Sequence, residues 1–130
     1  MGKPIRAVQI SALKGQWRTV NAVFDKGTFR SFIAESAVPA GSSILSYDRP
    51  ELAPTAKGGP IRITGVIFLL VRIGKKEIHD GFHISPDLPY ELLIGAITMR
   101  PWRISIRKAG CRTRVVVGND RRDPDLMAVE

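Results

Sequence analysis

One carboxylate of this 130-residue chain lies in a local sequence that suggests chemistry. Asp25 follows the hydrophobic pair Val23-Phe24 and comes two residues before Gly27. The segment Asp25-Lys26-Gly27-Thr28 interrupts a strand-like run and predicts a sharp turn at its end. A carboxylate at such a turn could act as an acid or a base, but an aspartate beside a glycine is also a common turn cap.

Two histidines and the single cysteine are the other residues that could bind a metal or attack a substrate. His79 and His83 are four residues apart in a predicted strand, so about 13 Å separates them and they cannot share one ion. Cys111 alone excludes an internal disulfide and a cysteine-based zinc site, and nothing nearby resembles a histidine partner. We interpret Asp80 and Asp87 as ordinary turn residues. No metal or cofactor is expected.

The elements that position Asp25 are predicted to be strands. β-Branched runs joined by Lys14-Gly15 predict a first hairpin, and runs joined by Gly74-Lys75-Lys76 predict a second. A short buried strand and one helical turn follow, and Pro101 limits the length of that turn. Residues 31–38 could form either a short strand or a helical turn. The expected ranges are 5–13, 17–24, 61–73, 77–84 and 92–95, with the helical turn within 96–102 and final strands at 104–106 and 113–117.

Two stretches are predicted to lack regular structure. Residues 39–60 contain seven prolines and glycines within 22 positions, which is typical of a loop. Loops of this length in compact domains are often functional lids. Residues 118–130 are predicted to be a polar tail.

The order of these segments resembles that of the retropepsin-like aspartic proteases, the retroviral-type family with bacterial and eukaryotic relatives. The matching blocks are 23–33 (VFDKGTFRSFI), Gly65-Val66 with Ile73-Gly74, and 91–96 (ELLIGA) followed by Thr98-Met99. The last block is similar to the Ile-Ile-Gly-Ala…Thr-Met stretch of bacterial members. The resemblance covers roughly residues 5–107. It implies a mostly β, single-domain, closed β-barrel-like fold with one short helix. The corresponding domain spans residues 1–110, and 111–130 form a basic strand and a polar C-terminal tail.

The resemblance also implies a mechanism, aspartic endopeptidase activity. Two aspartates held close together share one proton, so one acts as base toward water and the other as acid toward the peptide carbonyl. Because the chain has one Asp-x-Gly in the right context, the resemblance implies a C2 homodimer with Asp25 of each subunit at the axis. Gly27 would allow the tight turn that presents the carboxylate. Residues around Thr55 to Ile61, with Lys57, Gly58 and Gly59, would form a flap over a peptide or protein substrate.

The chain departs from the family pattern at Lys26, where the family has threonine or serine. By resemblance, that hydroxyl group forms a hydrogen bond across the dimer axis. Lysine offers no acceptor and places two like charges near one axis. A catalytically impaired binding or dimerisation module with the same fold is therefore an alternative to the active protease.

The net charge of +8 is concentrated near the C-terminus. Residues 100–122 carry eight basic side chains and one acidic one, whereas the last eight residues carry three acidic side chains. A basic β module that binds nucleic acid is thus a third hypothesis. Only Trp102 in this block could stack on bases, so we do not expect nucleic acid as a partner. No apolar run is long enough to span a bilayer and no signal peptide is recognisable, so a cytoplasmic location without a membrane partner is expected.

Overall fold

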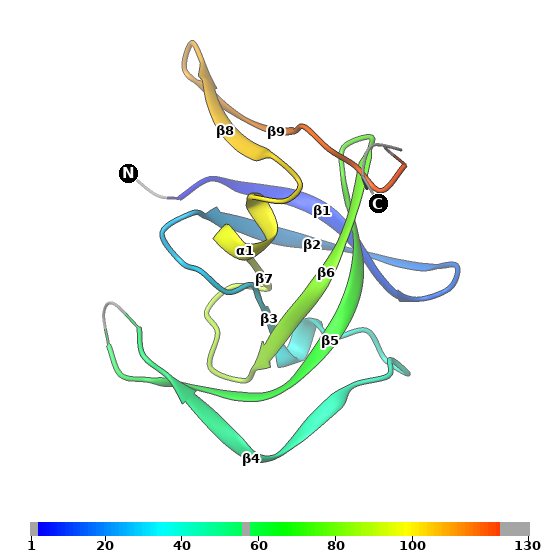
Figure 1. Cartoon of the computed structure of the whole chain (residues 1–130), viewed down its shortest axis with the longest axis vertical. Helices are drawn as coiled ribbons and strands as arrows, with labels where there is room; N and C mark the ends of the chain where they lie inside the picture. The colour runs from blue at the N-terminus through cyan, green and yellow to red at the C-terminus, as the bar shows by residue number, and fades with distance from the viewer. Residues whose placement is uncertain (1–2, 56–57, 123–130) are drawn as a thin grey trace, which may run out of the picture.

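The alternating apolar residues of the chain form strands in a computed structural model, which describes residues 3–55 and 58–122 (Figure 1). The strands are β1 (Ile5–Leu13), β2 (Gln16–Asp25), β3 (Phe32–Ala34), β4 (Leu45–Ala53), β5 (Ile61–Ile73), β6 (Lys76–Ser85), β7 (Leu92–Gly95), β8 (Ile104–Ala109) and β9 (Arg112–Val117). A short helix, α1 (Ala96–Met99), and a 3-10 turn, η1 (Glu35–Ala37), complete the described elements.

Six of the strands close into a barrel. The sheet order is β1-β2-β7-β3-β6-β5, and β1 returns to pair with β5 where Gln9, Ile10 and Ser11 face Arg72, Val71 and Leu70. Strand β4 extends the sheet beyond β5 and lies outside this closed circuit. The mostly β, closed-barrel fold with one short helix that the sequence implied is therefore confirmed.

The barrel interior is filled by the inward side chains of these strands. Along β5, fully or nearly fully buried positions alternate with more exposed ones, as a strand with one face on a core requires. The largest fully buried side chains include Phe24, Phe82, Ile10, Leu69 and Ile94. Burial of such side chains contributes roughly 1.5–3 kcal/mol each, so this core is the main source of stability for the elements around Asp25.

The prediction that residues 39–60 form a loop is wrong, because they contain β4. β4 pairs antiparallel with β5, and its register shifts between Ser46 and Glu51. Pro50 falls in that interval, and a proline without an N–H group is tolerated on an edge strand. Proline and glycine content therefore obscured a strand at an edge of the sheet. Residues 31–38, for which the sequence allows a strand or a helical turn, form both: β3 is followed by η1.

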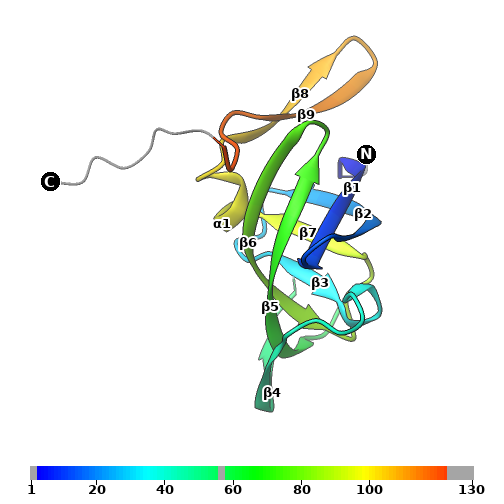
Figure 2. The ribbon, with the colours of Figure 1, turned by 90° about the vertical axis from the view of Figure 1, so that its right-hand side faces the viewer.

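After α1 the chain leaves the barrel as a separate hairpin. β8 and β9 pair only with each other within the described residues, and Figure 2 shows this hairpin extending away from the barrel. The boundary expected between residues 110 and 111 falls at the turn of the hairpin.

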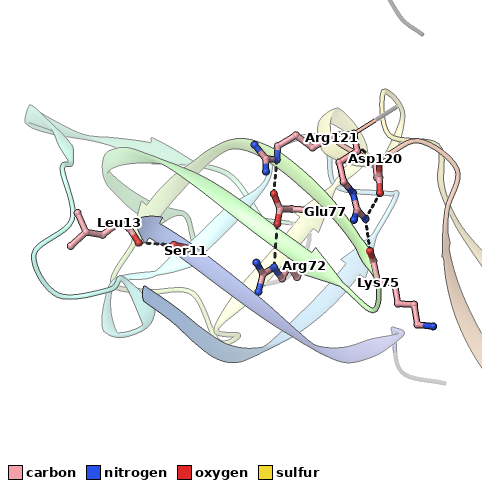
Figure 3. A network of polar contacts seen from close by, with 8 residues as sticks. Ser11, Leu13, Arg72, Lys75, Glu77, Asp120 and Arg121 are labelled. Atoms are coloured by element: carbon pink, nitrogen blue, oxygen red, sulfur yellow. Dashed lines mark hydrogen bonds and ion pairs between the residues drawn. The ribbon is translucent and has the colours of Figure 1, made fainter. Parts of the chain in front are cut away.

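The first residues after the hairpin return to the barrel, so the prediction of a polar tail from residue 118 is wrong for 118–122. Figure 3 shows Glu77 of β6 between Arg72 and Arg121, with which it forms ion pairs. The Arg121 N–H group also donates to the Glu77 carbonyl oxygen at 2.6 Å. Asp120 is buried and accepts hydrogen bonds from Arg122. These contacts anchor the chain against β5 and β6, while residues 123–130 lie outside the described residues.

Within residues 3–55 and 58–122, no helix has the length and apolar character needed to cross a membrane.

Candidate active site

The loop after Asp25 is held between two strands and a helix. Strand β2 runs parallel to β7, with Asp25 opposite Gly95. The loop crosses directly over Gly95: the N–H groups of Ala96 and Ile97 donate to the carbonyl oxygens of Thr28 and Phe29, each at 2.8 Å. A Cβ atom at Gly95 would collide with backbone carbonyl oxygens of this loop. Gly95 is therefore required for the close approach that fixes the loop.

Local hydrogen bonds orient the Asp25 carboxylate. Its Oδ1 accepts from the Gly27 N–H group at 3.0 Å, and its Oδ2 accepts from the Thr28 hydroxyl group at 2.8 Å. The Lys3 ammonium group lies 2.9 Å from the same Oδ2. The Asp25 side chain is only 12% exposed, so both oxygens act in a partly desolvated setting. The expected turn at Asp25–Thr28 forms, closed by a hydrogen bond from the Thr28 N–H group to the Asp25 carbonyl oxygen at 3.1 Å.

Opposing effects set the pKa of Asp25. Burial disfavours the charged carboxylate and raises its pKa. Hydrogen bonds from Lys3, Thr28 and Gly27, together with the charge of Lys3, lower the pKa by more than burial raises it. The net pKa lies below the ordinary value of 3.8. The same contact raises the pKa of Lys3. In this single chain Asp25 is thus a carboxylate at neutral pH, as a base requires.

Lys26 does not take part in this arrangement. It is exposed at the turn, and within the described residues it forms no ion pair. The cation on Asp25 is Lys3, 22 positions away along the chain, rather than the lysine next to it.

A buried chain of hydrogen-bonded hydroxyl groups supports the loop that follows Asp25. The Gly95 N–H group donates to Ser31 Oγ at 3.0 Å, and Thr98 donates to Asp80 Oδ2 at 2.7 Å. Ser31 Oγ lies 2.5 Å from Thr98 Oγ1, and because the Thr98 proton is used on Asp80, Ser31 is the donor. Ser31 and Thr98 are almost completely buried. Asp80 lies within β6 and anchors α1 beneath the loop, so its interpretation as an ordinary turn residue is wrong.

The expected flap corresponds to the turn that joins β4 and β5. Thr55 Oγ1 donates to the Gly59 carbonyl oxygen at 2.8 Å, and Gly58 has φ of +86°, a conformation that favours glycine. Lys57 lies outside the described residues. Arg30, in the loop after Asp25, forms a 2.8 Å ion pair with Glu51 of β4. This contact links the Asp25 loop to the β4–β5 arm, and both lie on the left in Figure 1.

The remaining candidates lie apart from Asp25. His79 and His83 are both on β6, and their rings contact Phe68 and Phe32 respectively. No cluster of three or more His, Cys, Asp or Glu side chains suited to a metal ion occurs in the described part of the chain. Asp87 is paired with Arg62 through two side-chain hydrogen bonds, and this lowers its pKa to about 2.

Sequence reasoning did not assign roles to Lys3, Thr28, Ser31 and Thr98. Thr28 could have been found, because a hydroxyl group three residues after an aspartate commonly bonds to it within a turn. Lys3 could not, because its contact depends on how β1 and its preceding residues lie along β2, where the Phe24 N–H group donates to the Pro4 carbonyl oxygen at 3.0 Å.

Comparison with known proteins supports the fold. The retroviral protease-like domain of Ddi1 from Leishmania major is similar over 86% of this chain and 87% of that domain, with a TM-score of 0.53 and 15% sequence identity. A Legionella pneumophila protein of unknown function matches over 72% of this chain and 82% of its own, with a TM-score of 0.42 and 14% identity. No protein-family model matches the sequence, and no curated protein matches it either. The chain thus has a retropepsin-like fold.

Proposed function

We propose that this protein is an aspartic endopeptidase that acts as a homodimer, with Asp25 of each copy in one shared site. The observation that carries the proposal is the Asp25 loop. A largely buried carboxylate is held by Gly27 and Thr28 on a turn that crosses Gly95, within a retropepsin-like fold.

Each copy supplies one carboxylate, and the chemistry needs two. Between two adjacent carboxylates one proton is shared, since both cannot ionise comfortably. The ionised Asp25 takes a proton from water as the water oxygen bonds to the peptide carbonyl carbon, and the protonated Asp25 gives its proton to the carbonyl oxygen. The C–N bond then breaks: the leaving amine takes the proton from one Asp25, and the other Asp25 takes a proton from a hydroxyl group of the resulting diol, which becomes the carboxylic acid product and restores the shared proton. Hydrogen bonds from Gly27 and Thr28 hold each carboxylate in a fixed orientation during these proton transfers.

Exposed apolar side chains beside the loop support a second copy as partner. Phe29 is 58% exposed and Ile97 is 41% exposed, and the two residues are joined by a backbone hydrogen bond. Apolar side chains exposed together next to a half-site favour burial against another chain. The symmetric copy would bring its own Asp25 with the same surface.

Lys3 must separate from Asp25 in the active dimer. Its positive charge favours two ionised carboxylates and so opposes the shared proton. The N-terminal segment that carries Lys3 is therefore expected to shift when the second Asp25 arrives.

The test is cleavage of a mixed peptide library between about pH 4 and 7, with oligomer size measured on the same samples. Cleavage by a dimer that is lost in Asp25→Asn supports the proposal. Absence of cleavage from a confirmed dimer would refute it. If only a monomer is found, Lys26→Thr is assayed next. We expect threonine at this position to favour the dimer and to raise cleavage activity at acidic pH. A weaker dimer in Lys26→Thr would contradict that expectation.

The second candidate is a peptide-binding module of the same fold that does not cleave. The Lys3–Asp25 ion pair and the lysine at position 26 favour it, because both place positive charge where a proton must be shared. In that case peptides bind the wild type and Asp25→Asn equally well and no product forms.

A further inference from the structure

The β8–β9 hairpin has two different faces. Ile104 lies opposite Val117, and Ile106 lies opposite Val115; these residues are buried or pack against the barrel core. Because side chains alternate along a strand, the intervening pairs point to the other face. Those pairs are Ser105 with Val116, Arg107 with Arg114, and Ala109 with Arg112. The face turned away from the core therefore carries three arginines.

These arginines are exposed and have no acidic neighbour along the chain. Arg107, Arg112 and Arg114 are all exposed, and there is no Asp or Glu between Glu91 and Asp120. Arg107 and Arg114 are directly opposite each other, an arrangement of like charges that destabilises a strand pair. Such a pair is expected where the charges serve a ligand rather than the hairpin.

Five carboxylates of the described chain form ion pairs with cations outside the hairpin. In the described residues, Asp25 pairs with Lys3, Glu51 with Arg30, Asp87 with Arg62, Glu77 with Arg72 and Arg121, and Asp120 with Arg122. Within residues 3–55 and 58–122, no ion pair includes Arg107, Arg112 or Arg114. The cationic face is thus free to bind an external anion.

The chemistry of this face favours phosphate. Arginine presents a planar fork that binds phosphate oxygens through two hydrogen bonds. The hairpin from residue 104 to 117 contains no aromatic side chain that could stack on unpaired bases or anchor a protein interface. It also lacks a large apolar side chain on the outer face for insertion into lipid.

The shape of the hairpin selects among phosphate-bearing partners. A two-stranded β ribbon fits the major groove of B-form DNA, whereas the major groove of A-form RNA is too narrow. Six residues per strand give a ribbon of about 20 Å, and Figure 2 shows its turn end projecting beyond the barrel.

We infer that the β8–β9 hairpin binds double-stranded DNA in its major groove, through phosphate contacts from Arg107, Arg112 and Arg114. This site is independent of Asp25. Binding is expected to be insensitive to base sequence, because the three arginines are assigned to phosphate groups, which carry no sequence information.

The test measures binding of a fluorescent DNA duplex of about 20 base pairs by anisotropy at several salt concentrations. The wild type is compared with the triple variant Arg107→Gln, Arg112→Gln, Arg114→Gln. Three phosphate contacts account for a slope of about −2.7 in log K against log salt, or about a 40-fold fall in affinity between about 50 and 200 mM salt. We expect the triple variant to lose this part of the salt dependence, while its thermal unfolding midpoint stays the same or rises slightly because the repulsion between Arg107 and Arg114 is removed.

A matched control removes the same charge from surfaces outside the hairpin. Lys14, Arg18 and Arg49 are exposed cations, so Lys14→Gln, Arg18→Gln, Arg49→Gln gives the same net charge. This control is expected to keep the wild-type salt slope. An equal loss in both triple variants would show that net charge alone is responsible and would overturn the inference.

Location is tested with the natural cysteine. Cys111 is exposed at the hairpin turn, so a photo-crosslinker attached there should link the protein to duplex DNA. The same group moved to the β1–β2 turn by Cys111→Ser, Lys14→Cys should give little product. Tighter binding to an RNA duplex, to poly-glutamate or to anionic lipid vesicles than to duplex DNA would contradict the proposed partner.

Discussion

At the scale of single residues, the chemistry depends on how Asp25 is held. The sequence predicted Asp25 and the turn at Gly27, because a glycine after a strand-like run is a local signal. The hydrogen bond from Thr28 is local as well. Lys3 could not be predicted, because the ion pair joins positions 22 residues apart and exists only once the chain before β1 lies along β2.

Replacement of Lys3 by methionine is expected to raise the pKa of Asp25, since burial remains while one hydrogen bond and a positive charge are lost. A depressed pKa means that Asp25 stabilises the fold above about pH 3.8 and loses this contribution as the pH falls through its lower folded-state value. Lys3→Met should therefore flatten the dependence of unfolding free energy on pH in this acidic range. The pKa is measured by NMR titration of the Asp25 carboxyl carbon, and Lys26→Met is the control, with no change expected. An unchanged pKa in Lys3→Met would show that the ion pair is absent in solution.

The pKa of Asp87 gives a second test at this scale. The hydrogen bonds from Arg62 lower it to about 2. In Arg62→Gln the pKa of Asp87 should return toward its ordinary value of 3.8. The stabilising effect of the pair, present above about pH 3.8 and lost as the pH falls toward 2, should disappear with it. Because the pair is substantially exposed, the change in stability at neutral pH is expected to be small. A value near 2 in the variant would contradict this assignment.

At the scale of elements, hydrophobic periodicity predicted most strands, whereas edge strands and connecting segments were harder to predict from the sequence. In β5, β6 and β7 the apolar residues stand at the positions that the fold buries, so the sequence pattern alone indicates these strands. β4 was missed because its Pro50 and flanking glycines resemble a loop, and its pairing depends on β5 rather than on its own sequence. The link from Asp80 through Thr98 to Ser31 was missed because it joins three separate segments.

The buried link from Asp80 to Ser31 predicts a specific loss of stability. Thr98→Val keeps the side-chain shape but leaves the buried Ser31 hydroxyl group without its acceptor and partly buried Asp80 without a donor, which costs roughly 1–3 kcal/mol. Urea unfolding measures this change, and Thr98→Ser should restore most of it. Thr113→Val, at an exposed position of β9, is the control and should change stability little. A neutral Thr98→Val would show that the link does not support the loop.

At the scale of the whole molecule, the resemblance of the block order to the retropepsin-like family implied a closed barrel, and the structure confirms it. The second subunit is proposed from two features of the single chain. The sequence contains one Asp-x-Gly, and Phe29 and Ile97 form an exposed apolar surface beside it.

The apolar surface beside Asp25 should control association. Phe29→Asp places charge on a surface that the second copy would cover, so the dimer dissociation constant should rise at least tenfold, equivalent to about 1.4 kcal/mol. Sedimentation velocity measures this change. Phe68→Asp, at another exposed aromatic residue on β5, is the control and should leave association unchanged. Equal association of Phe29→Asp and wild type would place the dimer interface elsewhere.

The most direct test of the shared site mixes wild-type protein with Asp25→Asn at fixed total concentration and measures peptide cleavage after subunit exchange. If both Asp25 carboxylates of a dimer are required, activity falls with the square of the wild-type fraction, to about a quarter in an equal mixture. Activity that falls in direct proportion to the wild-type fraction, to about half, would mean that each chain works alone and would contradict the shared site.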